Sequence, residues 1–390
     1  ENLHAYSTCD IKVLVEIFDC DDSVLRLEKN VVLCSGINYI DFNGVIRDAK
    51  LWWPNGMGEP FLYDVKVSVD SGSKVTSYPG FKFGLRTLKI NQDKLSWDEK
   101  LFAIEINGVR TFCKGANWIP ADSVYARVTE QKYDILLEEA KEANFNMLRI
   151  WGGGIYERDV FYEKCDEYGI MIWQDFMFAC SAVPDSLEWF RDEVKKEMDF
   201  QTRKLRNHPS LVLWCGNNEN YQSADSWFRE GDKYRYFGGS ICYNLIAPTV
   251  VRHNCPEIPY WNGSPYGGEF ALSDKMGDKH HWGECTMNPD MEKRITPEEY
   301  DSVTAKFVSE YGYIGPCCKS TIEKYHAGMP VDIDGRIWKL HNNTFEKDTV
   351  AAGVEKHYID PLGIDLNTYI LYAGLCQGLM YGYSLEALRF

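Results

Sequence analysis

The sequence predicts an α/β fold, a (β/α)8 TIM barrel over residues 93–390, preceded by an all-β immunoglobulin-like sandwich over residues 1–92. Three observations predict it. Short β-branched runs separated by turn residues fill the N-terminal part, strands then alternate with amphipathic helices, and polar residues follow the later strands directly.

The N-terminal part has the pattern of half-buried strands. Residues 11–17 are rich in β-branched side chains, and apolar and polar residues alternate over 65–69 and 81–85. Turn clusters separate these runs at 19–23, 54–56 and 70–73. Several short strands at this spacing favour a small sandwich.

The rest of the chain alternates strands and helices. We expect strands at 111–114, 147–151, 170–173, 211–215 and 306–309, and helices at 129–143, 160–168, 186–206 and 365–389. Thr129 is the expected N-cap of the first helix, Gly169 ends the second, and the third buries Leu187, Phe190 and Val194. Repeated βα units predict a parallel sheet.

Composition narrows the range of partners. Lys+Arg 42 against Asp+Glu 58 gives a net charge of −16, which argues against nucleic acid and anionic membranes. No apolar run is long enough to span a bilayer. The 13 cysteines are odd in number and irregularly spaced, which favours reduced, mostly buried thiols and a cytoplasmic location.

Two glutamates stand out among the polar residues that follow the strands. Glu219 and Glu310 each come at the end of an apolar strand, 91 positions apart. That interval holds about three βα units, so the two residues fall on strands four and seven. A retaining glycosidase needs two carboxyl groups about 5–5.5 Å apart across such a barrel mouth. The pattern itself predicts a two-carboxylate barrel hydrolase.

Several segments resemble glycoside hydrolase family 2 β-mannosidases. Residues 214–220 (WCGNNEN) and 307–312 (FVSEYG) are similar to the acid/base and nucleophile segments of that family. Its first and second strand motifs and its immunoglobulin-like domain are matched by 112–122, 148–154, 51–56 and 83–86. The resemblance runs from about residue 45 to 390.

The resemblance implies roles for individual residues. Glu219 would be the acid/base and Glu310 the nucleophile, and Asn218 would hold the sugar 2-hydroxyl. Trp151 and Trp227 match aromatic positions that line the mannose site.

Three further substrate-binding residues follow from the resemblance with alternatives left open. Trp118 could equally be barrel packing, Arg149 an internal ion-pair partner, and His280 a satisfied core histidine. Asp175 could be a supporting partner and is left out of the catalytic set.

The function these residues indicate is a retaining exo-β-mannosidase that acts on a β-mannoside or manno-oligosaccharide. The alternatives are another family 2 β-glycosidase (β-galactosidase, β-glucuronidase or exo-β-glucosaminidase type) or an inactive carbohydrate-binding fragment. We expect no cofactor and no metal, because His280, His281 and Glu284 lack metal-ligand spacing. A homodimer stays open.

The chain also departs from the pattern of complete family members. Their N-terminal jelly roll has no counterpart here, and no eighth barrel strand is expected before Phe390. We therefore expect a piece of a larger protein, with a barrel that possibly lacks its last strand.

Overall fold

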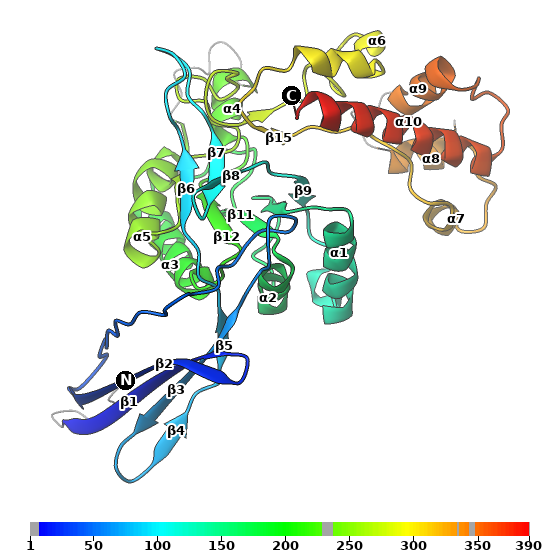
Figure 1. Ribbon diagram of the computed structural model, residues 1–390. Coiled ribbons are helices and arrows are strands. Elements are labelled where there is room, and N and C mark those ends of the chain that lie inside the picture. The colour runs from blue at the N-terminus through cyan, green and yellow to red at the C-terminus, as the bar shows by residue number, and fades with distance from the viewer. Residues whose placement is uncertain (1–7, 228–236, 334, 343–347, 390) are drawn as a thin grey trace. The chain divides into compact units, whose positions relative to one another are not determined.

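The computed structural model describes residues 8–227, 237–333, 335–342 and 348–389 (Figure 1). The chain forms two compact units, one from residues 1–92 and 103–263 and the other from 93–102 and 264–390. The boundaries of these units reflect which residues pack together, and they do not coincide with the point in the sequence where the β pattern changes to the α/β pattern. The domain limits 1–92 and 93–390 therefore stay a prediction.

The first unit begins with an antiparallel sheet in the order β2-β1-β3-β4, with β5 paired to β3. Its strands are β1 (Cys9–Asp19), β2 (Asp22–Leu33), β3 (Tyr63–Asp70), β4 (Val75–Ser77) and β5 (Phe81–Phe83). Val13 lies opposite Val69 and Ile17 opposite Val65, so the β-branched residues of β1 and β3 pair across the sheet. The strands predicted at 11–17 and 65–69 are confirmed.

The predicted sandwich needs a second facing layer, but the described residues 8–83 form a single sheet. Residues 34–62 run mainly as turns and loops, with an isolated bridge between Trp52 and Pro60. Prolines and glycines in this stretch interrupt strand pairing. The loop lies against β2, since a Cβ on Gly44 would stand 2.6 Å from Cδ2 of Leu25.

A parallel sheet in the order β13-β12-β11-β10-β9 forms the centre of the first unit. Its strands are β9 (Gly115–Trp118), β10 (Met147–Ile150), β11 (Met171–Asp175), β12 (Leu211–Cys215) and β13 (Tyr260–Trp261). Figure 1 shows α1 (Glu130–Glu142), α2 (Asp159–Tyr168), α3 (Glu188–Leu205) and α5 (Ala247–Asn254) flanking these strands. Their apolar faces meet the sheet in one buried core. The α/β alternation is confirmed.

The first strand of this sheet lies later than the sequence predicts. Thr111 ends β8 (Val109–Thr111), which belongs to an antiparallel sheet with β6 (Leu88–Asn91) and β7 (Ala103–Ile106). The parallel strand begins at Gly115 because its backbone approaches β10 closely: a Cβ there would stand 1.7 Å from the carbonyl oxygen of Met147.

The helix ends follow the predicted signals, with one error. Thr129 caps α1 by accepting a hydrogen bond from the Lys132 N–H, and Gly169 ends α2 with φ +71°. The predicted burial of Leu187 is wrong, because this residue is the N-cap before α3 and its side chain is 44% exposed.

The second unit contains a short parallel pair, β14 (Lys279–His280) and β15 (Val308–Glu310). The predicted strand at 306–309 is therefore shifted to end on Glu310. Described residues after Glu310 form helices and no strand; these are α7 (Lys319–His326), α8 (Arg336–His341), α9 (Thr349–His357) and α10 (Leu366–Ala387). Asp365 caps α10 through its carboxylate, which confirms the predicted last helix.

Short elements complete the two units. They are η1 (Tyr125–Arg127), α4 (Asn220–Gln222), η2 (Ser223–Trp227) and η4 (Cys242–Ile246) in the first, and α6 (Met291–Arg294) and η5 (Pro297–Ser302) in the second. Together the described strands establish an α/β fold with parallel pairing.

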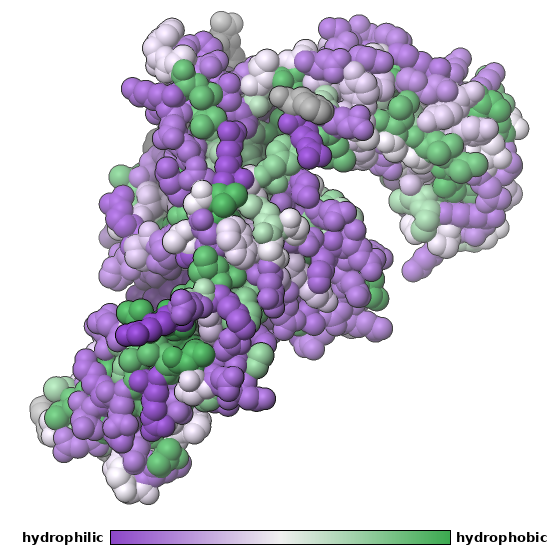
Figure 2. Space-filling model, in the orientation of Figure 1, coloured by the Kyte–Doolittle hydropathy of each residue, from purple (hydrophilic) through white to green (hydrophobic). Residues whose placement is uncertain are grey.

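Two further features are the exposed apolar residues of α10 and the exposure of the cysteines. Figure 2 shows hydrophobic residues on the surface over the α8–α10 region, and α10 exposes Leu371, Leu375 and Leu379 along one face. Six of the 13 cysteines are buried, so the thiols are not mostly buried as predicted. Within the described ranges, every helix is too short or too polar to cross a membrane.

Candidate active site

A buried ion pair lies at the C-terminal ends of β10 and β11. Arg149 Nη2 is 2.8 Å from Asp175 Oδ2, and the side chains are 4% and 0% exposed. Asp175 also accepts hydrogen bonds from Trp173 Nε1 (3.0 Å) and the Gly152 N–H (3.0 Å). Burial raises the pKa of Asp175, and the Arg149 guanidinium opposes that shift.

Arg149 also fixes the two amides beside it. Its Nη1 donates to Asn117 Oδ1 at 2.9 Å, and its Nη2 donates to Asn218 Oδ1 at 2.8 Å. Asn117 lies on β9, and Asn218 lies three residues past the end of β12. The alternative interpretation of Arg149 as an internal ion-pair partner therefore describes its contacts, and Asp175 is its supporting partner.

Glu219, the predicted acid/base, is the next residue after Asn218. Glu219 has φ +59°, the left-handed region, and its backbone turns the chain from β12 into α4. Its carboxylate accepts a hydrogen bond from the Cys180 thiol, with Sγ 3.3 Å from Oε2. A non-glycine residue in this conformation is strained by roughly 1 kcal/mol or more, and such strain concentrates at functional sites.

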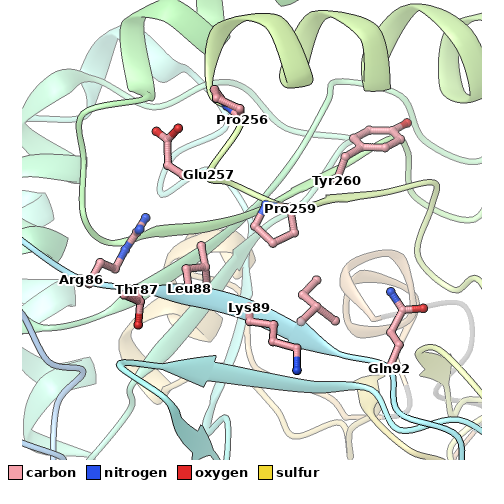
Figure 3. Close-up of a pocket in the computed structure, with 10 residues that line it drawn as sticks. Arg86, Thr87, Leu88, Lys89, Gln92, Pro256, Glu257, Pro259 and Tyr260 are labelled. Atoms are coloured by element: carbon pink, nitrogen blue, oxygen red, sulfur yellow. The ribbon is translucent and has the colours of Figure 1, made fainter.

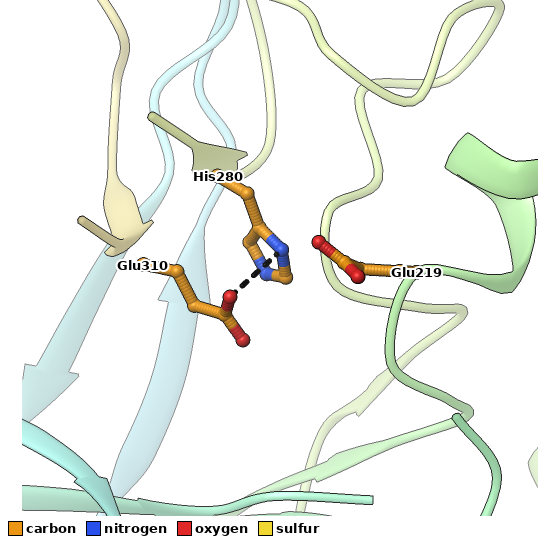
Figure 4. A group of neighbouring side chains, drawn as sticks. All are labelled: Glu219, His280 and Glu310. Carbon is orange, nitrogen blue, oxygen red and sulfur yellow. Dashed lines mark ion pairs between the residues drawn. The ribbon is translucent and has the colours of Figure 1, made fainter. Parts of the chain in front are cut away.

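The predicted nucleophile lies at the end of β15 in the second unit. Glu310 Oε2 accepts a hydrogen bond from Trp282 Nε1 at 2.9 Å and lies 3.3 Å from Nδ1 of His280. Figure 4 draws this ion pair as a dashed line, together with the side chain of Glu219. The Trp282 N–H and the His280 imidazole thus both lie against one oxygen of the carboxylate.

His280 is itself buried and anchored. Its Nε2 is 3.0 Å from Ser264 Oγ, and the Ser264 hydroxyl donates to Asp278 Oδ2 at 2.6 Å. The contacts from Ser264 to His280 and from His280 to Glu310 resemble those of a serine-hydrolase triad. Ser264 is fully buried, however, and its proton is committed to Asp278, so it serves to hold the imidazole against Glu310.

Trp118 does not face these groups. Its indole stacks among Tyr133 and Phe161 of the flanking helices, and its Nε1 donates to the buried Glu157 carboxylate at 2.9 Å. Side chains alternate along a strand, so Asn117 points to Arg149 while Trp118 points into the helical layer. These contacts are those of the packing alternative, and the predicted sugar contact of Trp118 stays a prediction.

The other two predicted tryptophans have different surroundings. Trp151, one residue past β10, is half-buried, and its ring lies over the backbone of Gly153, where a Cβ would come within 2.0 Å of the ring. Trp227 ends η2 and is 48% exposed. Their sugar contacts stay a prediction.

A pocket of about 550 Å³ in the first unit contains none of the predicted residues (Figure 3). It lies at the start of β13, between β6 and the loop that holds Pro256, Glu257 and Pro259. Glu219 follows the opposite, C-terminal end of β12. The pocket therefore lies at the N-terminal ends of these parallel strands, and Glu219 lies at their C-terminal ends.

Sequence reasoning missed three residues of the site, namely Asn117, Cys180 and Trp282. Asn117 and Trp282 lie inside segments already recognised, and strand alternation would have pointed to Asn117. Cys180 comes five residues after the end of β11 in an irregular turn, and no sequence pattern points to it.

Carboxylates at strand ends of an α/β fold with parallel strands define a candidate glycoside hydrolase. The comparisons agree with this class. The family model for glycosyl hydrolases family 2 matches residues 3–86. Together with the relatives below, this match confirms the resemblance drawn from the motifs, and the chain belongs to glycoside hydrolase family 2.

The similar proteins are β-mannosidases. "Beta-mannosidase B" of Emericella nidulans is 33% identical over 358 residues, which covers 87% of this chain and 41% of that protein. "Beta-mannosidase B" of Aspergillus terreus is 33% identical over 355 residues, with the same coverage. The chain thus spans less than half the length of these curated relatives.

A solved structure is similar over almost the whole chain. The β-D-mannosidase of Dictyoglomus thermophilum is 35% identical and has a TM-score of 0.87, covering 98% of this chain and 46% of that one. A β-glucuronidase of Bacteroides uniformis, 19% identical with a TM-score of 0.54, covers 66% of this chain and 30% of its own and shows likeness of fold alone.

Proposed function

We propose that the protein is a retaining exo-β-mannosidase that removes terminal β-D-mannosyl residues from β-mannosides or manno-oligosaccharides. In this proposal Glu310 attacks the anomeric carbon and forms a glycosyl-enzyme intermediate. Glu219 first protonates the departing oxygen and then takes a proton from the water that releases the sugar.

The observation that carries the proposal is the placement of the segment 214–220. It puts Glu219 in a strained turn at the end of β12 and fixes Asn218 through Arg149. An amide held in this way beside an acid/base is suited to bind a sugar hydroxyl, where hydrogen bonds strengthen in the transition state. The names of the relatives at 33% and 35% identity support mannose as the sugar.

The nucleophile and the retaining mechanism have separate tests. We expect Glu310→Gln to abolish release of nitrophenol from 4-nitrophenyl β-mannoside, because no nucleophile remains. Glu193→Gln is a matched control, since this exposed glutamate on α3 lies on the protein surface. Full turnover by Glu310→Gln would refute the assigned nucleophile. NMR of the first product should show the β-anomer, and an α-anomer would exclude the retaining mechanism.

The sugar preference is tested separately. We expect β-mannoside to be hydrolysed faster than β-galactoside, β-glucoside and β-glucuronide. Equal or faster turnover of one of these would assign the protein to another family 2 β-glycosidase. Binding of mannose without any turnover would favour the inactive carbohydrate-binding alternative.

The barrel and the location belong to the same proposal. We infer that strands β9 to β15 are the first seven strands of a (β/α)8 barrel, which their parallel pairing supports. An experimental structure with the Glu219 and Glu310 carboxyls more than about 9 Å apart would contradict the retaining mechanism.

A cytoplasmic location is proposed from the cysteine usage and is testable by fractionation of cells.

A further inference from the structure

The thiol of Cys180 is hydrogen-bonded to Glu219, the proposed acid/base, and to Asn218, the amide proposed to bind a sugar hydroxyl. Its Sγ lies 3.3 Å from Glu219 Oε2, to which the S–H donates, and 3.4 Å from Asn218 Nδ2, whose N–H donates to sulfur. The backbones are joined too, because the Cys180 N–H donates to the Asn218 carbonyl at 2.9 Å and Asn218 N–H to the Phe178 carbonyl at 2.8 Å. Backbone hydrogen bonds thereby join the turn after β11 to the turn after β12.

These contacts continue the buried network. Asp175 holds Arg149, Arg149 Nη2 donates to Asn218 Oδ1, and Asn218 Nδ2 donates to Cys180. This sequence of donors fixes which way the Asn218 amide is turned. An Nδ2 amide carries two N–H bonds, so one can bond the sulfur while the other points to a substrate hydroxyl.

We propose that Cys180 is a positioning residue, which orients the Glu219 carboxyl for proton transfer to the leaving group and fixes the Asn218 amide beside it. The inference rests on the proposed function for its kinetic part only. A thiol is a weak donor, so it orients the carboxyl while leaving it able to exchange a proton. Cys180 is exposed, and any group attached to its sulfur would stand against Glu219.

The kinetic test compares leaving groups. Cys180→Ala should lower kcat/KM about three- to tenfold on a methyl or mannosyl β-mannoside, whose departing oxygen needs a proton, and less than about twofold on 2,4-dinitrophenyl β-mannoside. Cys180→Ser, which restores an O–H donor, should recover most of the loss. Equal losses on both substrates, or no rescue by serine, would refute the positioning role.

Cys20→Ala is the matched control. Cys20 is also an exposed cysteine with a left-handed backbone, φ +54° against +56° for Cys180, but it lies in the turn between β1 and β2. The two alanine variants therefore carry the same backbone strain, and only Cys180→Ala should alter the ratio between substrates.

A second measurement needs no turnover and separates this inference from the proposed function. A carboxylate next to a thiol disfavours the thiolate, which is the form that iodoacetamide attacks with loss of iodide. The rate of Cys180 alkylation, followed by peptide mass spectrometry, should rise several-fold in Glu219→Gln while that of Cys20 stays unchanged. An unchanged Cys180 rate would refute the contact, whether or not the protein hydrolyses β-mannosides.

Discussion

Replacing Arg149 by Met should destabilise the first unit strongly, and increasingly so as the pH rises. Arg149 and Asp175 are 4% and 0% exposed and 2.8 Å apart. Removing the guanidinium leaves a buried carboxylate whose remaining donors, which include Trp173 Nε1 and the Gly152 N–H, are neutral. The loss of one partner of a buried pair costs about 3–5 kcal/mol.

The pH dependence follows from the direction of the Asp175 pKa. Burial already raises this pKa, and without Arg149 it rises further. A carboxyl whose pKa is higher in the folded state stabilises the fold most fully below its unfolded pKa, near 3.9, and that contribution is lost as the pH rises through the folded pKa. The difference between wild type and Arg149→Met should therefore be smaller at about pH 5 than at about pH 8.

Urea denaturation followed by tryptophan fluorescence at both pH values measures the effect. Arg149→Met combined with Asp175→Asn should recover about half of the lost unfolding free energy, because no unpaired charge stays buried. Lys196→Met, which breaks an exposed pair with Glu193, should change nothing measurable. A loss below about 1 kcal/mol, or a loss that is equal at both pH values, would show that Asp175 does not depend on Arg149 for its charge.

Three further predictions concern single contacts. Trp118→Phe removes a hydrogen-bond donor from the buried Glu157 and should lower the unfolding free energy by about 2–3 kcal/mol in urea denaturation. KM for β-mannoside should stay unchanged, and a raised KM would show that Trp118 contacts the sugar. Thr129→Ala should lower the unfolding free energy by about 1 kcal/mol through loss of the α1 cap, and an unchanged midpoint would contradict this. Hydrogen bonds from Ser320 and Thr321 lower the pKa of Cys318 to about 7, so its alkylation should be half-maximal near pH 7 and shift upward in Ser320→Ala, whereas a midpoint near pH 9 would refute it.

Local signals in the sequence were sufficient where one residue type determines the geometry. The cap at Thr129, the left-handed end at Gly169 and the buried strand 211–215 depend on the residue itself and its immediate neighbours. The predicted start of the first parallel strand was wrong because it does not depend on local residues alone. Thr111 has the strand-forming side chain, but the close approach at Gly115 depends on Met147, which is remote in sequence.

The candidate site was predictable in its chemistry and less so in its contacts. Motif segments pointed to Asn218, Glu219 and Glu310 because the proposed reaction requires those residue types, and their catalytic roles stay a prediction. The direction of a side chain depends on its place in the strand. The motif pointed to Trp118, which contacts Glu157, and passed over Asn117, its neighbour on the opposite face, which contacts Arg149. Cys180 reaches Glu219 only through the pairing of two irregular turns, which no local pattern encodes.

The backbone of Glu219 carries the last prediction, because its conformation opposes stability. An L-residue at φ +59° is strained, whereas glycine adopts this conformation readily. Glu219→Gly should therefore unfold with a free energy about 1 kcal/mol higher than Glu219→Ala, although glycine gives the unfolded chain more freedom. Both variants should be inactive on methyl β-mannoside, and urea denaturation compares them. If Glu219→Ala is as stable as Glu219→Gly, the turn relaxes when the side chain is removed, and the strain belongs to the carboxyl contacts and not to the path of the chain from β12 into α4.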